Sequence, residues 1–129
     1  MARGHGISGV TMADRLDAVM SEVRAFVRER EWERFHNSKN LAMAIASEAG
    51  ELLSEYRWID DKEADTWSKD PENQARVANE AADVGIALLL FCDQVGVNLL
   101  DAIRRKVAIN RANYPVEASR GKAERPRGL

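Results

Sequence analysis

Residues 70–96 read DPENQARVANEAADVGIALLLFCDQVG, and this stretch decides the fold class. Its apolar side chains recur every three or four residues, which is the period of one helix face; they are Val77, Ala81, Val84, Ala87, Leu88 and Phe91. Asp70 and Pro71 are typical of a helix start, and Gly96 is typical of a helix end. We therefore expect a helix over about residues 71–94.

The same period recurs on both sides of this stretch. It predicts one helix over about residues 11–33, with Thr11 as its cap, and a second over about residues 40–58. A final helix is expected from the capping residue Asn98 to just before Pro115. Residues 59–70 lack a period and predict a loop, and no segment alternates polar with apolar residues as a half-buried strand does. The fold class is therefore all-α, with four helices.

The chain has 129 residues, which is the length of one domain. We expect a loose, glycine-rich arm over residues 1–10, the helical domain over residues 11–115 and a mobile basic tail over residues 116–129. The 45% of hydrophobic residues include 19 alanines, so the core should be thin and supplemented by self-association.

Charge and composition exclude several classes of protein. Lys and Arg number 19 against 21 for Asp and Glu, a balance that argues against binding to a nucleic-acid polymer. No apolar stretch reaches the length of a membrane span, and the N-terminus lacks the apolar region of a signal peptide. A single cysteine, Cys92, excludes an internal disulfide and fits a reducing compartment. The sequence therefore predicts a cytoplasmic protein without membrane contact.

Two acid pairs lie beside apolar faces that must be buried. In the second expected helix, Glu48 lies on nearly the same line as Leu41, and Glu51 lies on the same flank. In the third, Glu80 lies on the apolar stripe and Asp83 at its edge. An unpaired buried carboxylate costs several kcal/mol, and converging carboxylates repel one another. A divalent cation such as Mg²⁺ or Mn²⁺, which prefers oxygen ligands, removes both penalties.

These acids have two alternative roles. The carboxylates can form salt bridges on the helix surface with Arg57, Arg76 or Arg104, which is the ordinary role of such residues. A diiron site requires Glu-x-x-His pairs, and neither His5 nor His36 stands in that relation to a glutamate of these helices. A redox metal site is therefore disfavoured, whereas the salt-bridge alternative stays open.

The acid pairs carry a family resemblance. Glu48-Ala-Gly-Glu51 followed by Glu80-Ala-Ala-Asp83 resembles the MazG-like family of all-α nucleoside triphosphate pyrophosphohydrolases. Flanking segments are similar to the dCTP pyrophosphatase branch of that family; they are residues 31–36, Asn40-Leu41, Tyr56-Arg57-Trp58, Lys106, Asn110-Arg111, Tyr114-Pro115 and Ser119-Arg120-Gly121. The resemblance covers roughly residues 12–123.

This resemblance implies hydrolysis of a (deoxy)nucleoside triphosphate to the monophosphate and pyrophosphate, with dCTP or a modified dCTP as the first candidate substrate. It implies that Glu48, Glu51, Glu80 and Asp83 hold Mg²⁺, with Mn²⁺ as an alternative, and that the metal binds the triphosphate. The chemistry is consistent, because four carboxylates repel a triphosphate unless metal lies between them. The catalytic base that accepts a proton from the attacking water is Glu51 by preference, with Glu48 as the other candidate.

The resemblance also implies residues around the nucleobase. Trp32, His36 and Trp58 are expected there, because aromatic rings stack on bases. A tryptophan at a helix end more often fills a gap in the core, so this assignment depends on the family pattern.

The final expected helix has candidate contacts to the rest of the substrate. Lys106 and Arg111 have the chemistry of phosphate ligands, although cations on a helix are often simply solvated. The resemblance implies that Lys106, Asn110 and Tyr114 contact the substrate. Arg120 is expected to reach a phosphate if the tail folds over the site.

The resemblance further implies a homodimer or a homotetramer whose sites borrow residues from a neighbouring subunit. Ser47 stands where many family members have another glutamate, which leaves the number of metal ions open. Alternative substrates are dUTP, other noncanonical triphosphates and phosphoribosyl-ATP. The alternative outside enzymes is a non-catalytic nucleotide-binding or helical interaction module whose acids only form salt bridges.

Overall fold

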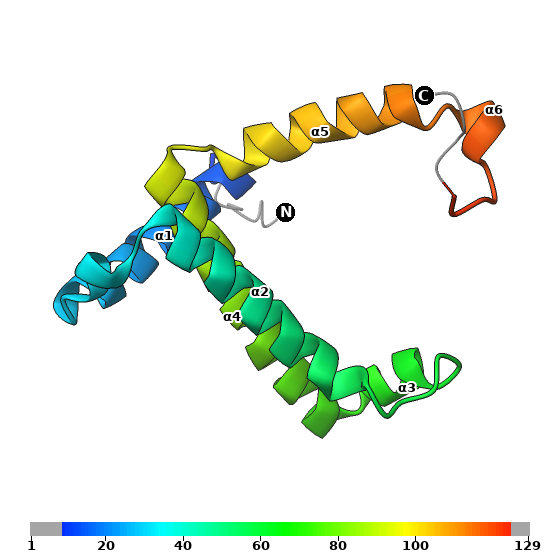
Figure 1. The fold of residues 1–129 in the computed structure, drawn as a ribbon, viewed down its shortest axis with the longest axis horizontal. Coiled ribbons are helices and arrows are strands. Elements are labelled where there is room, and N and C mark those ends of the chain that lie inside the picture. The colour runs from blue at the N-terminus through cyan, green and yellow to red at the C-terminus, as the bar shows by residue number, and fades with distance from the viewer. Residues whose placement is uncertain (1–8, 125–129) are drawn as a thin grey trace, which may run out of the picture. The chain divides into compact units, whose positions relative to one another are not determined.

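The computed structural model describes residues 9–124, and every regular element in that range is helical (Figure 1). The elements are α1 (Met12–Glu29), the 3-10 helix η1 (Trp32–Phe35), α2 (Ser38–Tyr56), α3 (Ala64–Lys69), α4 (Pro71–Val95), α5 (Leu99–Asn113) and α6 (Val116–Ser119). The all-α class is therefore confirmed. The chain divides into two compact units, one up to Gly96 and one from Val97 onward, and each is described by itself.

Side-chain caps fix where three helices begin. Thr11 accepts a hydrogen bond from the backbone N–H of Asp14, and the Asp14 carboxylate accepts one from the backbone N–H of Thr11, both at 3.0 Å. Asn37 and Asn98 cap α2 and α5, each accepting from the backbone N–H three residues later, at 2.8 and 3.0 Å. These bonds satisfy N–H groups that lack a partner within the helix.

The predicted first helix is too long. α1 ends at Glu29, and Glu31 takes a left-handed backbone with φ of 53°. This turn starts η1 and allows the Trp32 ring to pack edge-on against Phe26, with ring centroids 5.7 Å apart. Aromatic packing therefore overrides the helical preference of residues 30–33.

The predicted loop over residues 59–70 is wrong in its middle, because α3 forms there. The ring of Trp67 packs edge-on against Tyr56 at 5.1 Å, and the hydroxyls of Tyr56 and Ser68 share a hydrogen bond of 2.7 Å. α4 then begins at Pro71 as expected, although Asp70 makes no side-chain capping bond. These contacts return the chain from the end of α2 to the start of α4.

The core of the first unit is small. α2 and α4 run side by side (Figure 1) and have the most extensive helix–helix contact, while α1 packs against α4. The buried apolar side chains are Met20, Val27, Leu41, Ala87 and Cys92. Burial raises the pKa of the Cys92 thiol, as expected for a small core residue. Ala81 is exposed although the sequence places it on the buried stripe. The thin core expected from the composition is confirmed for residues 9–124.

The second unit begins after Gly96, whose φ of 73° ends α4 as predicted. α5 carries exposed apolar side chains, among them Ile103 and Val107. Within the expected tail, residues Val116–Ser119 form the short helix α6. Residues 1–8 of the expected arm and 125–129 of the expected tail lie outside the described residues, and the domain boundaries at residues 10 and 115 stay predictions.

No single helix within residues 9–124 is long and apolar enough to cross a membrane. α4 and α5 meet such a test of length and composition only when they are joined across the break at Gly96.

Candidate functional site

Three carboxylates meet between α2 and α4. One oxygen each from Glu48, Glu80 and Asp83 lies within 4.8 Å of the others. Glu48 and Glu80 are half-buried, and Asp83 is exposed. The two helices supply one acid pair each, and their side-by-side packing brings these pairs together. We call Glu48, Glu80 and Asp83 the acid cluster.

Electrostatic repulsion is concentrated on Glu80. Its pKa is raised by desolvation first and then by the charges of Asp83, Glu51, Glu48 and Glu55. Glu51 therefore lies near enough to act on Glu80, although it is exposed and lies outside the acid cluster. The structure thus brings three of the four expected metal ligands together and places the fourth close by.

The acid cluster has no basic partner among the described residues. On the same two helices, Arg76 Nε pairs with Glu55 Oε2 at 3.3 Å, and Arg76 Nη2 donates to the Asn73 side-chain oxygen. Within residues 9–124, no ion pair reaches Glu48, Glu51, Glu80 or Asp83. The salt-bridge alternative therefore accounts for Glu55 and leaves the acid cluster unneutralised. Closely spaced, partly desolvated carboxylate oxygens are a donor set that fits a hard divalent cation.

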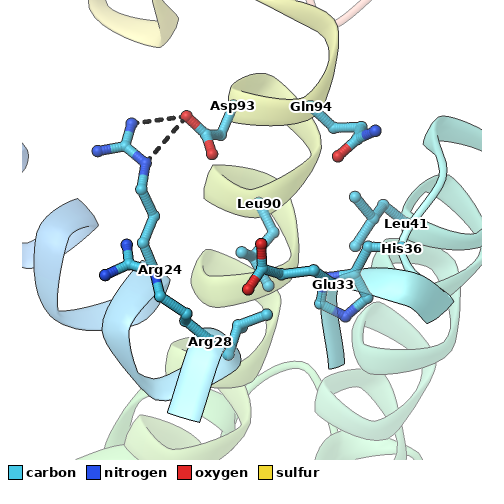
Figure 2. Close-up of a pocket in the computed structure, with 9 residues that line it drawn as sticks. Arg24, Arg28, Glu33, His36, Leu41, Leu90, Asp93 and Gln94 are labelled. Atoms are coloured by element: carbon cyan, nitrogen blue, oxygen red, sulfur yellow. Dashed lines mark hydrogen bonds and ion pairs between the residues drawn. The ribbon is translucent and has the colours of Figure 1, made fainter. Parts of the chain in front are cut away.

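A pocket of about 170 Å³ lies between α1, η1, α2 and α4 (Figure 2). Its lining combines apolar and polar side chains: Arg24, Val27, Arg28, Glu33, His36, Leu41, Leu90, Asp93 and Gln94. The guanidinium of Arg24 donates from Nε and Nη2 to Asp93 Oδ1, at 3.1 and 2.6 Å, and joins α1 to α4. This bond lowers the pKa of Asp93 below its ordinary value. The pocket has charged and amide groups around an apolar interior, which is typical of a small-molecule site.

The pocket and the acid cluster share a stripe of the α2–α4 pair. Leu41 of the pocket and Glu48 of the cluster are seven residues apart, which puts them at nearly the same angle and about 10 Å apart along α2. Leu90 and Asp83 have the same separation on α4. The two regions therefore lie about 10 Å apart along the helix pair.

The residues expected around a base are only partly brought together. His36 is half-buried and lines the pocket. Trp32 is 43% exposed and packs on Phe26, outside the lining. Trp58 is 84% exposed, and its ring has the Arg57 guanidinium 5.3 Å away. The structure of this single chain therefore places His36 alone of the three in the pocket.

Five polar residues of the pocket were not predicted from the sequence: Arg24, Arg28, Glu33, Asp93 and Gln94. The sequence contained one indication of this polar lining. Arg24 and Arg28 are four residues apart on α1, which places both cations on one helix face beside the apolar Val27. The pairing of Arg24 with Asp93 spans 69 residues and had no local signal.

The remaining expected contacts lie in the second unit. Lys106, Asn110 and Arg111 are exposed on α5, and the spacing of Lys106 and Asn110 puts them on a common face. Tyr114 ends α5 and donates its backbone N–H to the Asn110 carbonyl at 2.7 Å. Arg120 follows α6 and is exposed.

Comparisons with known proteins extend the resemblance across most of the chain. The model of the MazG-like family matches residues 43–127. The dCTP pyrophosphatase 1 of Mus musculus is 37% identical over 107 residues, which are 80% of this chain and 63% of that protein. The Homo sapiens protein of the same name is 34% identical over 100 residues, which are 78% and 59% of the two chains. The chain thus spans less than two thirds of the length of these relatives.

A solved structure is similar in fold. The crystal structure of a pyrophosphatase from Archaeoglobus fulgidus matches with a TM-score of 0.71 and 33% identity. The match covers 78% of this chain and 93% of that one.

Proposed function

Because this chain belongs to the MazG-like family, we propose that it hydrolyses a nucleoside triphosphate to the monophosphate and pyrophosphate with the help of a divalent cation. The observation that carries this proposal is the acid cluster, in which Glu48, Glu80 and Asp83 meet without a basic partner among the described residues. The pyrophosphatase names of the relatives and of the solved structure support the same reaction.

The acid cluster would hold Mg²⁺ or Mn²⁺, with Glu51 as the fourth ligand or as the catalytic base. When bound, the cation would neutralise phosphate charge and make a coordinated water more acidic. Glu51 is the better candidate for the base, because it is exposed and lies outside the cluster while staying close to Glu80. Glu48, which belongs to the cluster, is the second candidate.

The proposed substrate is dCTP or a modified dCTP, a choice supported by the names of the relatives. The triphosphate would lie at the acid cluster and the base in the pocket, about two helical turns away, with His36 against the ring. Trp32 and Trp58 are proposed as further base contacts, Trp58 from a neighbouring subunit, because it lies about 25 Å from Leu41 along α2 and beyond the acid cluster. Both are substantially exposed in this chain, so each has surface available for a ring.

The second unit would supply groups that bind the phosphates and the sugar. Cationic hydrogen-bond donors for the phosphates would come from Lys106, Arg111 and Arg120. Neutral hydrogen-bond donors would come from Asn110 and Tyr114. We also propose that the chain forms a homodimer or a homotetramer. Support comes from the small core of the first unit and from apolar side chains left exposed on both units. The cytoplasmic location stays a prediction from the sequence.

The test of the proposed function is pyrophosphate release from canonical and cytosine-modified nucleoside triphosphates, with dUTP and phosphoribosyl-ATP included. Each reaction is run with Mg²⁺ and with EDTA. Metal-dependent release that favours dCTP-type substrates is the expected result. Release that favours dUTP would support the proposed reaction but would contradict dCTP as the proposed substrate. If the folded protein releases no pyrophosphate from any compound in the presence of Mg²⁺, the non-catalytic module replaces the enzyme.

A further inference from the structure

Asp93 presents an unused acceptor at the pocket. Both hydrogen bonds from Arg24 go to Oδ1, and within residues 9–124 no hydrogen bond reaches Oδ2 (Figure 2). The side chain is 38% exposed, so this second oxygen can accept a bond from a ligand. The adjacent Arg24 keeps the carboxylate ionised, because its hydrogen bond lowers the pKa of Asp93.

A fixed carboxylate distinguishes bases by one substituent. Cytosine has an amino group at its 4-position, which donates hydrogen bonds, whereas uracil and thymine have a carbonyl oxygen there, which only accepts. A carboxylate accepts a bond from the amino group and repels the carbonyl oxygen. Gln94 both donates and accepts, so its amide does not make this distinction by itself.

The rest of the pocket is compatible with such a ring. The apolar side chains of Val27, Leu41 and Leu90 can cover its faces, and Arg28 has only donors, which suit the acceptor atoms of a base. Glu33 adds a second carboxylate to the lining, but among the described residues no hydrogen bond holds its side chain, whereas Arg24 holds that of Asp93. Among the described residues Arg28 forms no ion pair, so its guanidinium is available.

We propose that Asp93 determines base specificity by accepting a hydrogen bond from the 4-amino group of a cytosine-type base, so that the pocket selects aminopyrimidines over ketopyrimidines. This inference rests on the proposed function, because it places the base of the same substrate in the pocket. Arg24 acts as a positioning residue that holds Asp93 in one orientation.

The variant Asp93→Asn tests the inference through kcat/KM for dCTP and dUTP. An amide of the same shape can turn its NH₂ group toward a carbonyl oxygen. We therefore expect the dCTP-to-dUTP ratio to fall by about tenfold or more. Arg24→Gln removes the bonds that position Asp93 but leaves the carboxylate, so the ratio should fall less than in Asp93→Asn. Asp61→Asn makes the same chemical change on an exposed loop and should leave both values unchanged.

A second measurement uses the unmodified protein and does not depend on the folding of a variant. A dCTP analogue with hydrogen in place of the 4-amino group should lose about tenfold or more in kcat/KM relative to dCTP. An unchanged ratio in folded Asp93→Asn, or an equal kcat/KM for this analogue, would overturn the role of Asp93. The proposed function fails separately, through absence of pyrophosphate release from every triphosphate by the wild-type protein.

Discussion

The acid cluster and the pocket lie about two turns apart on the same helix pair, yet their carboxylates have opposite electrostatic environments. At the acid cluster, desolvation and neighbouring acids raise the pKa of Glu80. At the pocket, the hydrogen bond from Arg24 lowers the pKa of Asp93. The same functional group is thus disfavoured as an anion at one place and favoured at the other.

The difference lies in where the countercharge comes from. The chain supplies Arg24 to Asp93 from a helix distant in sequence, and it supplies Arg76 to Glu55 beside the acid cluster. Within residues 9–124 it supplies no cation to Glu48, Glu80 or Asp83. A group of carboxylates left without a countercharge by the fold is stabilised by taking up a proton, as the raised pKa of Glu80 indicates, or by binding a cation from solution. This contrast favours a metal site at the cluster and a self-contained polar site at the pocket.

Removing one charge from the acid cluster should give the largest effect. Glu80→Gln is expected to lower pyrophosphate release by about a hundredfold or more, because it removes a ligand and weakens the positioning of the triphosphate. Its stability in EDTA should stay equal to that of the wild type or increase, because the repulsion with Asp83 and Glu51 is relieved. Steady-state kinetics and thermal unfolding in EDTA measure the two effects.

Glu22→Gln is the matched control, because Glu22 is exposed on α1 and distant in sequence from both acid pairs. This variant should change neither pyrophosphate release nor stability. If Glu80→Gln instead destabilises the metal-free protein and retains full activity, Glu80 is a structural residue and the contrast between the two regions disappears.

Metal binding should stabilise the fold through the acid cluster. At a free Mg²⁺ concentration of about 100 times its Kd, the free energy of unfolding is expected to rise by about 2.7 kcal/mol, since the ion binds the folded state alone. Urea unfolding with Mg²⁺ and with EDTA measures this shift. In Asp83→Asn the shift should shrink strongly at the same Mg²⁺ concentration. An undiminished shift in that variant would place the stabilising ion elsewhere on the chain.

The parts of the fold that sequence reasoning predicted are those encoded locally. The capping residues Thr11 and Asn98 and the stop at Gly96 act within a few residues of their positions. Asn37 also caps locally, but the helix was predicted to begin near residue 40, so this cap was missed. The acid pairs were found for a similar reason, because a spacing of three residues beside an apolar stripe places both carboxylates on one flank of a helix.

The parts that were missed depend on contacts between segments. α3 is held by packing of Trp67 on Tyr56, and η1 follows a left-handed Glu31 that brings Trp32 to Phe26. The pocket was missed because its polar lining comes from separate helices. The helical period of a sequence predicts which side chains share one face of a helix. It does not predict which face of another helix will pack against them.

The smallest expected effect comes from the pocket's ion pair. The side chains of Arg24 and Asp93 are 44% and 38% exposed, so Arg24→Gln should lower the free energy of unfolding only slightly at pH 7. Because Arg24 lowers the pKa of Asp93, this contribution is fully present above the ordinary aspartate pKa near 3.8. The contribution is lost as the pH falls through the lowered pKa that Asp93 has in the folded protein.

Urea unfolding of wild type and Arg24→Gln between about pH 7 and pH 2.5 measures this dependence, in low salt because screening weakens exposed pairs. The two stabilities should converge at acid pH. A difference that persists at the lowest pH would mean that the aliphatic part of Arg24 stabilises α1 by packing, and that charge is not its main contribution. Convergence for Arg24→Gln, together with undiminished stability of Glu80→Gln in EDTA, would establish the contrast by thermodynamics. Removing a charge would then destabilise the fold at the Arg24–Asp93 pair, where the chain supplies the opposite charge, but not at Glu80, where it does not.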